Sequence, residues 1–449
     1  MATIRKRKDK YVVIYDYLDE SGKRKQKWET FDNKPEAAKR KSQIELDKAS
    51  NQFVAPSNQA LGDFLLEWAE IHGKANWQCH TYTGNIGLIK NHIIPYVGGI
   101  DIQKVMPRDI EKLYDTLRSK KISGIRSQGM DERPCLSSTS IRHVHTVLKM
   151  AFDKAVEWKI LQTSPVTCKA PKKNRRKEKN IWDAETVRMA LDSIDDPVLR
   201  LAVHLAFVCS MRNGETMALT WDCVDFEKKR ILINKTLQRI YKDVMEKLPT
   251  DKIHFVFPSQ VEDSKSVLVL KNPKTESSSR YIYITEQLKN ELLARKQQAE
   301  KDKAYWGSAY QDFNLVLSLA DGYPIEPKLC EKWFKKWQKK TDYDFPELIF
   351  HGLRHSSTTY KLMVSSGDVK SVQGDTGHAS ADMVVNTYSH VMDKARADLM
   401  KSIEGKFYGP STNEASQNAD ASGDIIMALI EKDRLLQQKV LRALGAHKV

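Results

Sequence analysis

Four short stretches in the second half of the chain carry side chains that could act on a phosphate ester. They are CSMRNGE with Arg212 and Glu215, KNPKTESSSR with Lys274, HGLRH with His351 and Arg354, and GDTGHASADMVVNTYSHV with His378 and Tyr388. Each stretch alone is weak evidence, because an arginine at a helix start is usually a surface residue. A tyrosine near the end of a domain is likewise usually a half-buried structural residue, so the joint content has to carry the interpretation.

Together these side chains suit an in-line attack on a phosphodiester without a metal ion. Two guanidiniums can each donate bidentate hydrogen bonds to the non-bridging oxygens and stabilise the charge of a five-coordinate phosphorus. A lysine can protonate the leaving 5′ oxygen, a histidine can handle the attacking group's proton, and a phenol can be the nucleophile. The sequence has no carboxylate cluster and no Walker loop to hold magnesium, so we expect no metal and no cofactor.

The region that must position these residues, residues 181–408, mixes helices with a strand-rich middle. WDAETVRMAL predicts a helix capped by Asp183, and LRLAVHLAFVCSM predicts a buried helix. RILINKTLQRI and SVLVLKNPKTESSSRYIYI read as strands, and YKDVMEKLPTDKIHFVFPSQVEDS between them is expected to be an insertion in a hairpin. Because the insertion lengthens the interval before Lys274, Lys271 is an alternative candidate for the lysine that protonates the leaving oxygen.

Two further regions precede this one. Residues 1–55 predict a small sheet plus a helix, since KYVVIYDYL and KQKWETF alternate around the turn DESGKR, and NKPEAAKRKSQIELDKAS follows with Asn33 as a helix cap and Pro35 in the first turn. Residues 60–168 predict four helices, because apolar residues recur at helical spacing between Gly, Pro and Ser breaks. The expected fold class is multidomain, with a small N-terminal β-sheet plus helix domain, an all-α domain and a mixed, mainly-α domain with a small β-sheet.

Segments of biased composition separate and follow these regions. Residues 169–180 form a basic linker whose positive run is Lys172, Lys173, Arg175, Arg176 and Lys177. Such a run can be simply solvated, but on a basic chain we interpret it as a strap along phosphates. Residues 409–423 predict a flexible linker. Residues 424–449 predict an amphipathic helix whose polar face carries both charge signs, which favours docking or a short coiled coil over a membrane anchor.

The overall composition restricts the class of partner. The chain has 449 residues and a formal net charge of +15, which indicates a polyanionic partner and favours nucleic acid over an acidic membrane surface. Its six cysteines are scattered without a C-x-x-C pair, as is usual in a reducing cytosol. No apolar run approaches the roughly 18 residues that span a bilayer. We therefore expect a cytoplasmic, nucleoid-associated protein with no membrane contact.

The four motifs, taken as an ordered set, resemble the tyrosine recombinase, or phage integrase, family. The matching elements are the arginine of RNGE, H-x-x-R followed by HSSTT, a lysine in a strand-turn setting between them, Gly377-His378, and a tyrosine ten positions after that histidine (388 − 378). The order of regions is similar to that of arm-binding integrases from temperate phages and conjugative transposons, over roughly residues 1–405. Two departures stand out: Thr376, preceded by QGD, replaces the usual leucine before Gly-His, and Asn213 follows the first arginine where a bulkier or charged residue is commoner.

The resemblance implies roles for individual residues. Arg212 and Arg354 would clamp the scissile phosphate, and Tyr388 would attack it to give a 3′-phosphotyrosyl bond and a free 5′ hydroxyl. Lys274 would be the general acid toward that hydroxyl.

The remaining residues would assist them. His351 would act as general acid or base near the tyrosine, and His378 would donate a hydrogen bond to the phosphate. Glu215 would orient a cationic neighbour, and His355 would be an interior structural residue.

The resemblance also implies partners and an activity. Residues 1–55 would bind arm-type DNA sites, residues 60–168 would bind core-type sites and residues 181–408 would catalyse. A homotetramer on double-stranded DNA would integrate and excise a mobile element without ATP, aided by an excisionase or a DNA-bending protein. Two alternatives are a type IB topoisomerase-like strand transferase, which the separate N-terminal domain argues against, and a non-catalytic DNA-binding regulator, which would not need the tyrosine and both arginines.

Overall fold

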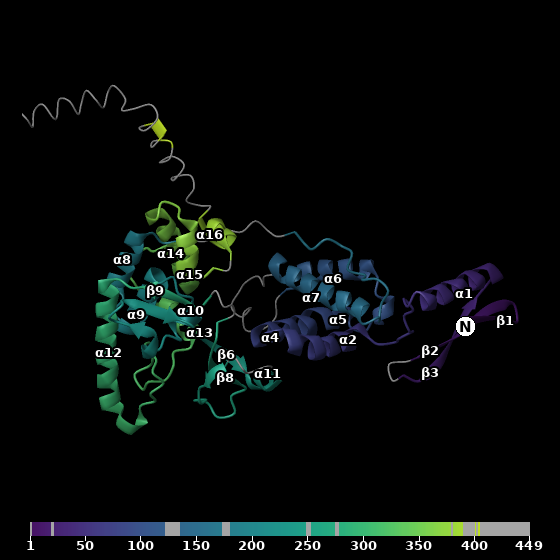
Figure 1. Cartoon of the computed structure of the whole chain (residues 1–449), viewed down its shortest axis with the longest axis horizontal. Helices are drawn as coiled ribbons and strands as arrows, with labels where there is room; N and C mark the ends of the chain where they lie inside the picture. Colours follow the sequence, from purple (N-terminus) through teal and green to yellow (C-terminus); the bar gives the residue numbers. More distant parts are fainter. Residues whose placement is uncertain are drawn as a thin grey trace, which may run out of the picture. The chain divides into compact units, whose positions relative to one another are not determined.

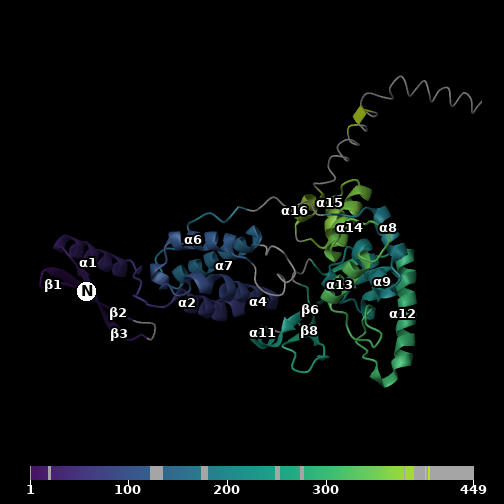
Figure 2. The ribbon, with the colours of Figure 1, turned by 180° about the vertical axis from the view of Figure 1, so that it is seen from behind.

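The computed structural model describes residues 2–18, 22–121, 135–172, 180–247, 253–273, 278–378, 380–388, 400 and 403–404. Contacts between Cα atoms divide the chain into two compact units. Unit 1 comprises Met1–Lys179 and Leu237–Asn272, and unit 2 comprises Asn180–Thr236 and Pro273–Val449. The two units are described separately below, with the elements labelled as in Figure 1 and seen from behind in Figure 2.

Unit 1 begins with a three-stranded antiparallel sheet of order β1-β2-β3, made of β1 (Ala2–Arg7), β2 (Lys10–Leu18) and β3 (Arg24–Phe31). Helix α1 (Lys34–Ala49) covers one face, and Val13, Ala37 and Ile44 are among the residues buried between them. As predicted, the side chain of Asn33 caps this helix by accepting a hydrogen bond from the backbone N–H of Glu36. The small N-terminal sheet with its helix is thus confirmed.

The next part of unit 1 is helical. The helical sequences LGDFLLEWAEIHG and HTYTGNIGLIKNHIIPYVG each contain a π-helical stretch, whereas MPRDIEKLYDTLRSK and SSTSIRHVHTVLKMAFDKAVEWKIL form regular α-helices. The elements are α2 (Leu61–Trp68), a π-helix (Ala69–Gly73), α3 (Lys74–Asn76), α4 (Cys79–Leu88), a π-helix (Ile89–Ile93), α5 (Ile94–Val97), α6 (Pro107–Ser119) and α7 (Ser138–Glu157). Apolar faces of these helices meet in one core, in which Phe64, Trp68, Leu148 and Phe152 are fully buried.

The insertion expected in a hairpin forms a small subdomain and packs with unit 1 rather than unit 2. It consists of β6 (Thr236–Tyr241), α11 (Lys242–Lys247), β7 (Ile253–Val256) and β8 (Ser266–Lys271), with the strand order β6-β8-β7. Val244 of α11 is buried against Tyr82 of α4, and Cys79 of α4 packs against the apolar side chains of the sheet. The inserted subdomain therefore has its apolar partner in the helical part of unit 1.

Unit 2 is mainly helical with one small antiparallel sheet of order β4-β5-β9. Helix α9, which is buried as predicted, packs against α8, α12, α13 and α14. The elements are α8 (Ala184–Ser193), α9 (Pro197–Val208), α10 (Asn213–Thr216), β4 (Val224–Asp225), β5 (Arg230–Ile233), β9 (Arg280–Tyr283), α12 (Glu286–Trp306), α13 (Pro327–Gln338), α14 (Phe350–Val364), α15 (Val369–Thr376) and α16 (Ala381–Tyr388). Asp183 caps α8 through the backbone N–H of Thr186, as its position in the sequence predicts.

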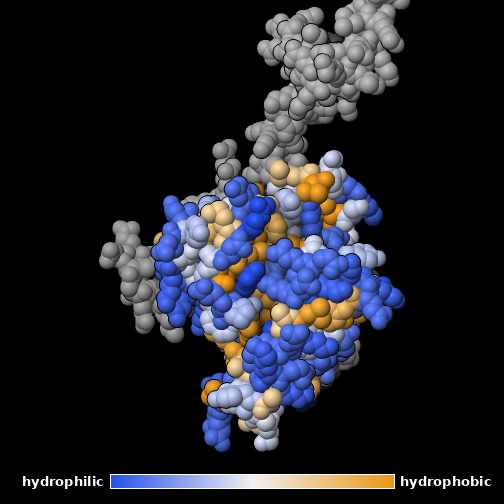
Figure 3. Space-filling view, turned by 90° about the vertical axis from the view of Figure 1, so that its left-hand side faces the viewer, coloured by the Kyte–Doolittle hydropathy of each residue, from blue (hydrophilic) through white to orange (hydrophobic). Residues whose placement is uncertain are grey.

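The surface in Figure 3 is mostly hydrophilic, with hydrophobic residues gathered in strips between the hydrophilic ones. Of the helices that the structure describes, none has the length and apolar character that a membrane crossing requires.

Candidate active site

Arg212 lies where buried helix α9 gives way to the short helix α10. Ser210, just after α9, has a left-handed backbone with φ of 49°, and its hydroxyl lies 2.6 Å from that of Ser357. Arg212 then occupies the N-cap position of α10, and Glu215 in the first turn accepts hydrogen bonds from the Arg212 backbone N–H at 3.1 Å and from its Nη1 at 2.6 Å. Glu215 therefore holds Arg212 at both its backbone and its side chain.

Arg354 is held by carbonyl groups from two other segments. It lies in α14 and is only 2% exposed, although arginine is rarely so buried. Its Nη1 donates to the carbonyl of Ser210 at 2.5 Å, and its Nη2 donates to the carbonyl of Thr376 at 2.6 Å. The unusual backbone of Ser210 thus aims a carbonyl at this guanidinium.

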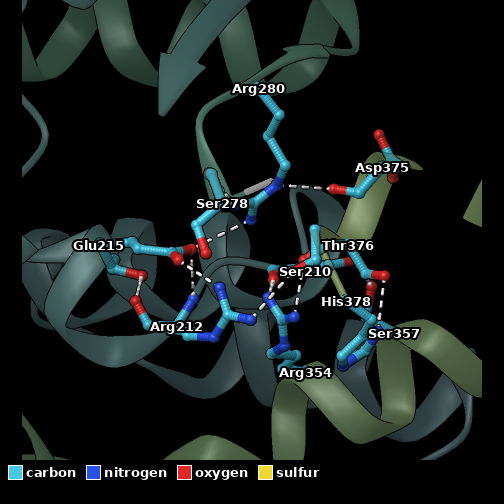
Figure 4. A network of polar contacts seen from close by, with 12 residues as sticks. Ser210, Arg212, Glu215, Ser278, Arg280, Arg354, Ser357, Asp375, Thr376 and His378 are labelled. Carbon is cyan, nitrogen blue, oxygen red and sulfur yellow. Dashed lines mark hydrogen bonds and ion pairs between the residues drawn. The ribbon is translucent and has the colours of Figure 1, made fainter. Parts of the chain in front are cut away.

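Three arginines converge on the carboxyl end of α15, as Figure 4 shows. The carbonyls of Asp375, Thr376 and Gly377 each accept a hydrogen bond from one arginine. Arg280 donates from Nε at 2.9 Å, Arg354 from Nη2 at 2.6 Å, and Arg212 from Nη2 at 3.0 Å, in that order along the carbonyls. Because the last carbonyls of a helix lack partners within the helix and carry partial negative charge, they are suitable acceptors for guanidiniums.

Gly377 allows Arg280 to lie close to the end of α15. Its φ is 63°, in the left-handed region where glycine has no steric cost, and a Cβ atom there would lie 3.0 Å from both Cδ and Nη1 of Arg280. A larger residue would therefore push the arginine away from the end of α15.

Arg280 is the site residue that the sequence analysis missed. It begins β9, is 8% exposed, and donates from Nη2 to Oε2 of Glu215 at 3.0 Å and from Nη1 to the carbonyl of Ser278 at 3.0 Å. The alternation of RYIY along a strand was the available signal, because it places Arg280 on the same buried face as Ile282.

The charges at this site are unbalanced. Burial alone would raise the pKa of Glu215, but the guanidiniums of Arg280 and Arg212 hold it below its ordinary value, so this carboxyl is ionised. Burial, followed by repulsion from Arg212, lowers the pKa of Arg354 to about 9, which still leaves it protonated at neutral pH. In the part of the site that the structure describes, Glu215 pairs with two of the three guanidiniums and Arg354 bonds only carbonyl groups, so positive charge is in excess and favours an anion.

His378 follows Gly377 and is 7% exposed. Its Nδ1 lies 2.7 Å from the hydroxyl of Thr376, and its backbone carbonyl accepts a hydrogen bond from Nε2 of Gln373 at 3.1 Å. Burial and then the charge of Arg354 lower the pKa of His378 to about 3. The imidazole is therefore neutral at physiological pH and has a single N–H.

The other two histidines lie in the first turns of α14. His351 is exposed and His355 is partly buried rather than fully internal, and their rings are perpendicular with centroids 5.0 Å apart.

Two more of the predicted residues, Tyr388 and Lys271, lie at the ends of described elements. Tyr388 is the last residue of α16, and one helical turn earlier Val384 is buried against Leu362 of α14 and Val372 of α15. The helix that carries Tyr388 is thereby anchored on the two helices that carry Arg354 and precede His378. Lys271 ends β8 in the inserted subdomain.

Several predictions fall on residues outside the described ranges. These are Lys274, four members of the positive run (Lys173, Arg175, Arg176 and Lys177), and the C-terminal segments 409–423 and 424–449. Lys172 is described and is exposed. Within the described ranges, no three His, Cys, Asp or Glu side chains gather as metal ligands do.

Asn213, the second departure from the family pattern, has a packing role. It is buried, and its Nδ2 donates to the carbonyl of Pro327 at 2.9 Å and to Glu331 at 3.2 Å, which ties α10 to α13.

Comparisons with known proteins show which proteins this chain is similar to. The model of the phage integrase family matches residues 183–395, and that of the phage integrase N-terminal SAM-like domain matches residues 60–118. A tyrosine recombinase XerC-like protein of Caldanaerobacter subterraneus subsp. tengcongensis is 24% identical over 399 residues, covering 87% of this chain and 94% of its own. An integrase of Saccharopolyspora erythraea is 20% identical over 377 residues, covering 77% and 82%.

Among solved structures, the Tn1549 transposon integrase in complex with a circular intermediate DNA superposes with a TM-score of 0.58 at 19% identity, covering 76% of this chain and 99% of that one. At that identity the likeness shows a common fold. Together with the matching family models and the long sequence alignments, it settles the assignment that the motif order suggested. The chain belongs to the phage integrase family, the tyrosine recombinases.

Proposed function

We propose that this protein is a site-specific DNA recombinase that integrates and excises a mobile element by cleaving and rejoining DNA through a 3′-phosphotyrosyl intermediate. The observation that carries this proposal is the convergence of Arg212, Arg354 and Arg280 on one helix end, where Glu215 pairs with Arg212 and Arg280. A phosphodiester brings a single negative charge, which such a cluster is suited to bind.

Arg212 and Arg354 are the phosphate clamp. Each guanidinium has five N–H donors, of which the structure engages two per residue on fixed acceptors, so donors remain for non-bridging oxygens. Because the acceptors lie on α10, the turn after α9 and the end of α15, the donors need little reorganisation when charge develops on phosphorus. Glu215 orients Arg212, and Arg280 in turn pairs with Glu215.

Tyr388 is the nucleophile, supported by the anchoring of α16 on α14 and α15 through Val384. Attack on phosphorus displaces the 5′ oxygen and conserves the phosphodiester as a protein ester, which a 5′ hydroxyl of another strand can reverse without ATP.

The proton transfers fall to a lysine and a histidine. Lys274 is the general acid for the leaving oxygen. Lys271, three residues earlier at the end of β8, is the competing candidate. His351 serves as general acid or base for the tyrosine, and neutral His378 donates to the phosphate.

The N-terminal sheet is the arm-type DNA-binding surface. Residues directly opposite in register share a face, and the face away from α1 carries Arg5 beside Val12 and Thr30, and Trp28 beside Ile14. Arg7, Lys10 and Arg24 lie on that face as well, although Lys10 pairs with Asp32 and Arg24 with Asp16. Strands of a sheet fit the major groove, where such side chains reach phosphates and base edges.

The remaining elements have proposed roles on DNA. Residues 60–168 bind the core site together with the catalytic unit, and residues 169–180 lie along the backbone. A homotetramer carries out strand exchange, with an excisionase or DNA-bending protein setting its direction. The protein acts in the cytoplasm on nucleoid DNA.

Covalent capture tests the central claim. The full chain is incubated in EDTA with a nicked core-site substrate of its own element, then denatured and resolved for a DNA-linked band. We expect a band for wild type and for Tyr360→Phe, a control tyrosine on the surface of α14, and none for Tyr388→Phe despite unchanged binding. A band retained in Tyr388→Phe refutes the nucleophile, and no band for bound wild type favours a regulator.

The clamp and the alternative enzyme class are tested on the same material. Arg212→Ala or Arg354→Ala should lower the cleavage rate by about 10²- to 10³-fold, as for loss of one preorganised donor. A plasmid without the core site should stay supercoiled, whereas a type IB topoisomerase-like enzyme would relax it.

For the sheet, Arg5→Ala should weaken arm-site binding and reduce its salt slope by about one, with core-site cleavage unchanged. Lys39→Ala, an exposed charge on α1 behind the sheet, is the matched control and should leave arm-site binding unchanged. Equal losses in both variants would contradict the choice of face.

A further inference from the structure

Thr376 is a side chain for which this chain departs from the family pattern, and its hydroxyl contacts a site residue. It is fully buried as the last residue of α15. Its Oγ1 lies 2.7 Å from the carbonyl of Val372, 3.3 Å from that of Gln373 and 2.7 Å from Nδ1 of His378. The leucine usual at this position could make none of these hydrogen bonds.

The backbone brings the imidazole back to this hydroxyl. Gly377 turns the chain into the left-handed region, and its N–H donates to the carbonyl of Gln373 at 2.8 Å. The side chain of Gln373 donates to the carbonyl of His378. His378 is thus fixed at its backbone, so the contact with Thr376 determines how its ring nitrogens are used.

A neutral imidazole has one N–H, and the partner of one nitrogen decides where that hydrogen lies. If the Thr376 hydroxyl donates to Nδ1, the hydrogen of His378 is on Nε2. If Nδ1 instead donates to the hydroxyl, Nε2 carries a lone pair. Only the first tautomer can donate to an anionic phosphate through Nε2, since a lone pair there would repel the phosphate oxygens.

We propose that Thr376 is a positioning residue for strand cleavage: with DNA bound, its hydroxyl donates to Nδ1 of His378 and fixes the tautomer whose Nε2–H donates to the scissile phosphate. The inference rests on the proposed function. It requires no movement of heavy atoms, because Oγ1 is already within hydrogen-bond distance of Nδ1 and the hydroxyl hydrogen only rotates away from the carbonyl of Val372.

The same residue also contacts the clamp. The carbonyl of Thr376 accepts from Arg354, while its hydroxyl contacts His378. One buried residue therefore sets both a guanidinium and an imidazole donor for the phosphate. The valine substitution removes only the hydroxyl and leaves the carbonyl contact in place.

Single-turnover cleavage of the nicked core-site substrate tests the proposal. Thr376→Val should slow cleavage about tenfold, the effect of losing one hydrogen bond of ordinary strength, with core-site Kd unchanged. Thr376→Ser, which keeps the hydroxyl, should stay within about twofold of wild type. The control is Thr358→Val, a fully buried threonine of α14 whose hydroxyl donates only to the backbone carbonyl of Arg354 at 2.8 Å, and it should also stay within about twofold.

Two further measurements separate positioning from packing. In a His378→Ala background, Thr376→Val should cause no additional slowing, because the hydroxyl acts through the imidazole. Nitrogen NMR of ¹⁵N-histidine-labelled protein on core DNA, with His378 assigned by its absence in His378→Ala, should show the Nε2–H tautomer in wild type.

The outcomes are distinguishable. Wild-type rates for Thr376→Val, the same slowing in both backgrounds, or an Nδ1–H tautomer on DNA would each overturn the inference while leaving the recombinase intact. If wild type forms no covalent product, the proposed function itself fails and this inference fails with it.

Discussion

Removing the charge of Arg280 should destabilise unit 2 and slow cleavage, although Arg280 is not a phosphate ligand in our proposal. Arg280→Met keeps a long apolar side chain but leaves Glu215, which is 4% exposed, with Arg212 as its remaining guanidinium partner among those described. Breaking a buried ion pair typically costs about 3–5 kcal/mol, and because Arg212 remains we expect about 3 kcal/mol. For a domain of roughly 200 residues this corresponds to a fall in Tm of about 6–12 °C.

Calorimetry of the full chain, with the single-turnover cleavage rate measured below the transition, checks this prediction. Lys303→Met is the control, because Lys303 and Asp312 form an ion pair whose side chains are 51% and 52% exposed, and such exposed pairs contribute little to stability. Glu215→Gln added to Arg280→Met should recover part of the lost stability, since it removes a buried carboxylate charge that has lost one of its two guanidinium partners. A loss of about 3 kcal/mol should lower the Tm by more than about 2 °C. A Tm for Arg280→Met within about 2 °C of wild type would therefore refute the reasoning.

Three other features lead to stability predictions. His378 has a pKa of about 3 in the folded protein against an ordinary value of 6.5, so the unfolded chain binds the proton first as the pH falls. The free energy of unfolding should therefore decrease as the pH drops below 6.5, by up to about 1.4 kcal/mol per pH unit. His378→Ala should flatten that slope when unfolding is measured in urea. Val244→Asp, which places a charge in a buried contact, should speed hydrogen exchange in β8 and α4, whereas Val256→Asp, at a position 41% exposed, should not. Ser210→Gly should change the free energy of unfolding by less than about 1 kcal/mol, because glycine adopts the left-handed backbone without strain and this gain offsets the lost hydroxyl contact. Ser210→Val should lower the free energy of unfolding by more than about 2 kcal/mol.

Local rules predicted the elements of this protein well where their causes are local. Asn33 and Asp183 cap helices because a short polar side chain can reach the N–H groups of the first turn, a property that depends on a few adjacent residues. The alternation in KYVVIYDYL likewise gave the strand whose one face is covered by α1. The order of motifs also predicted that Arg212, Arg354 and His378 would meet.

The partner of the inserted subdomain could not be predicted in this way. Its apolar residues, Val244 and Ile240 among them, would read equally well as packing within a hairpin, and nothing local indicates that Tyr82 and Cys79 of a distant helix cover them. Arg280 was missed for a related reason. A single charged residue at the start of a strand is usually exposed, and only the tertiary structure supplies the carboxylate and carbonyls that make its burial favourable.

The departures around His378 explain how three neighbouring guanidiniums are held in place. Gln373 bonds the backbone of His378, Asp375 pairs with Lys361, and Thr376 contacts the imidazole, so three side chains of the unusual QGDT segment each hold the end of α15 in place. That end in turn supplies the carbonyls that fix the guanidiniums. Mutual repulsion among the arginines is therefore opposed by fixed dipoles rather than by a second carboxylate, and a phosphate that relieves the repulsion should bind with little rearrangement.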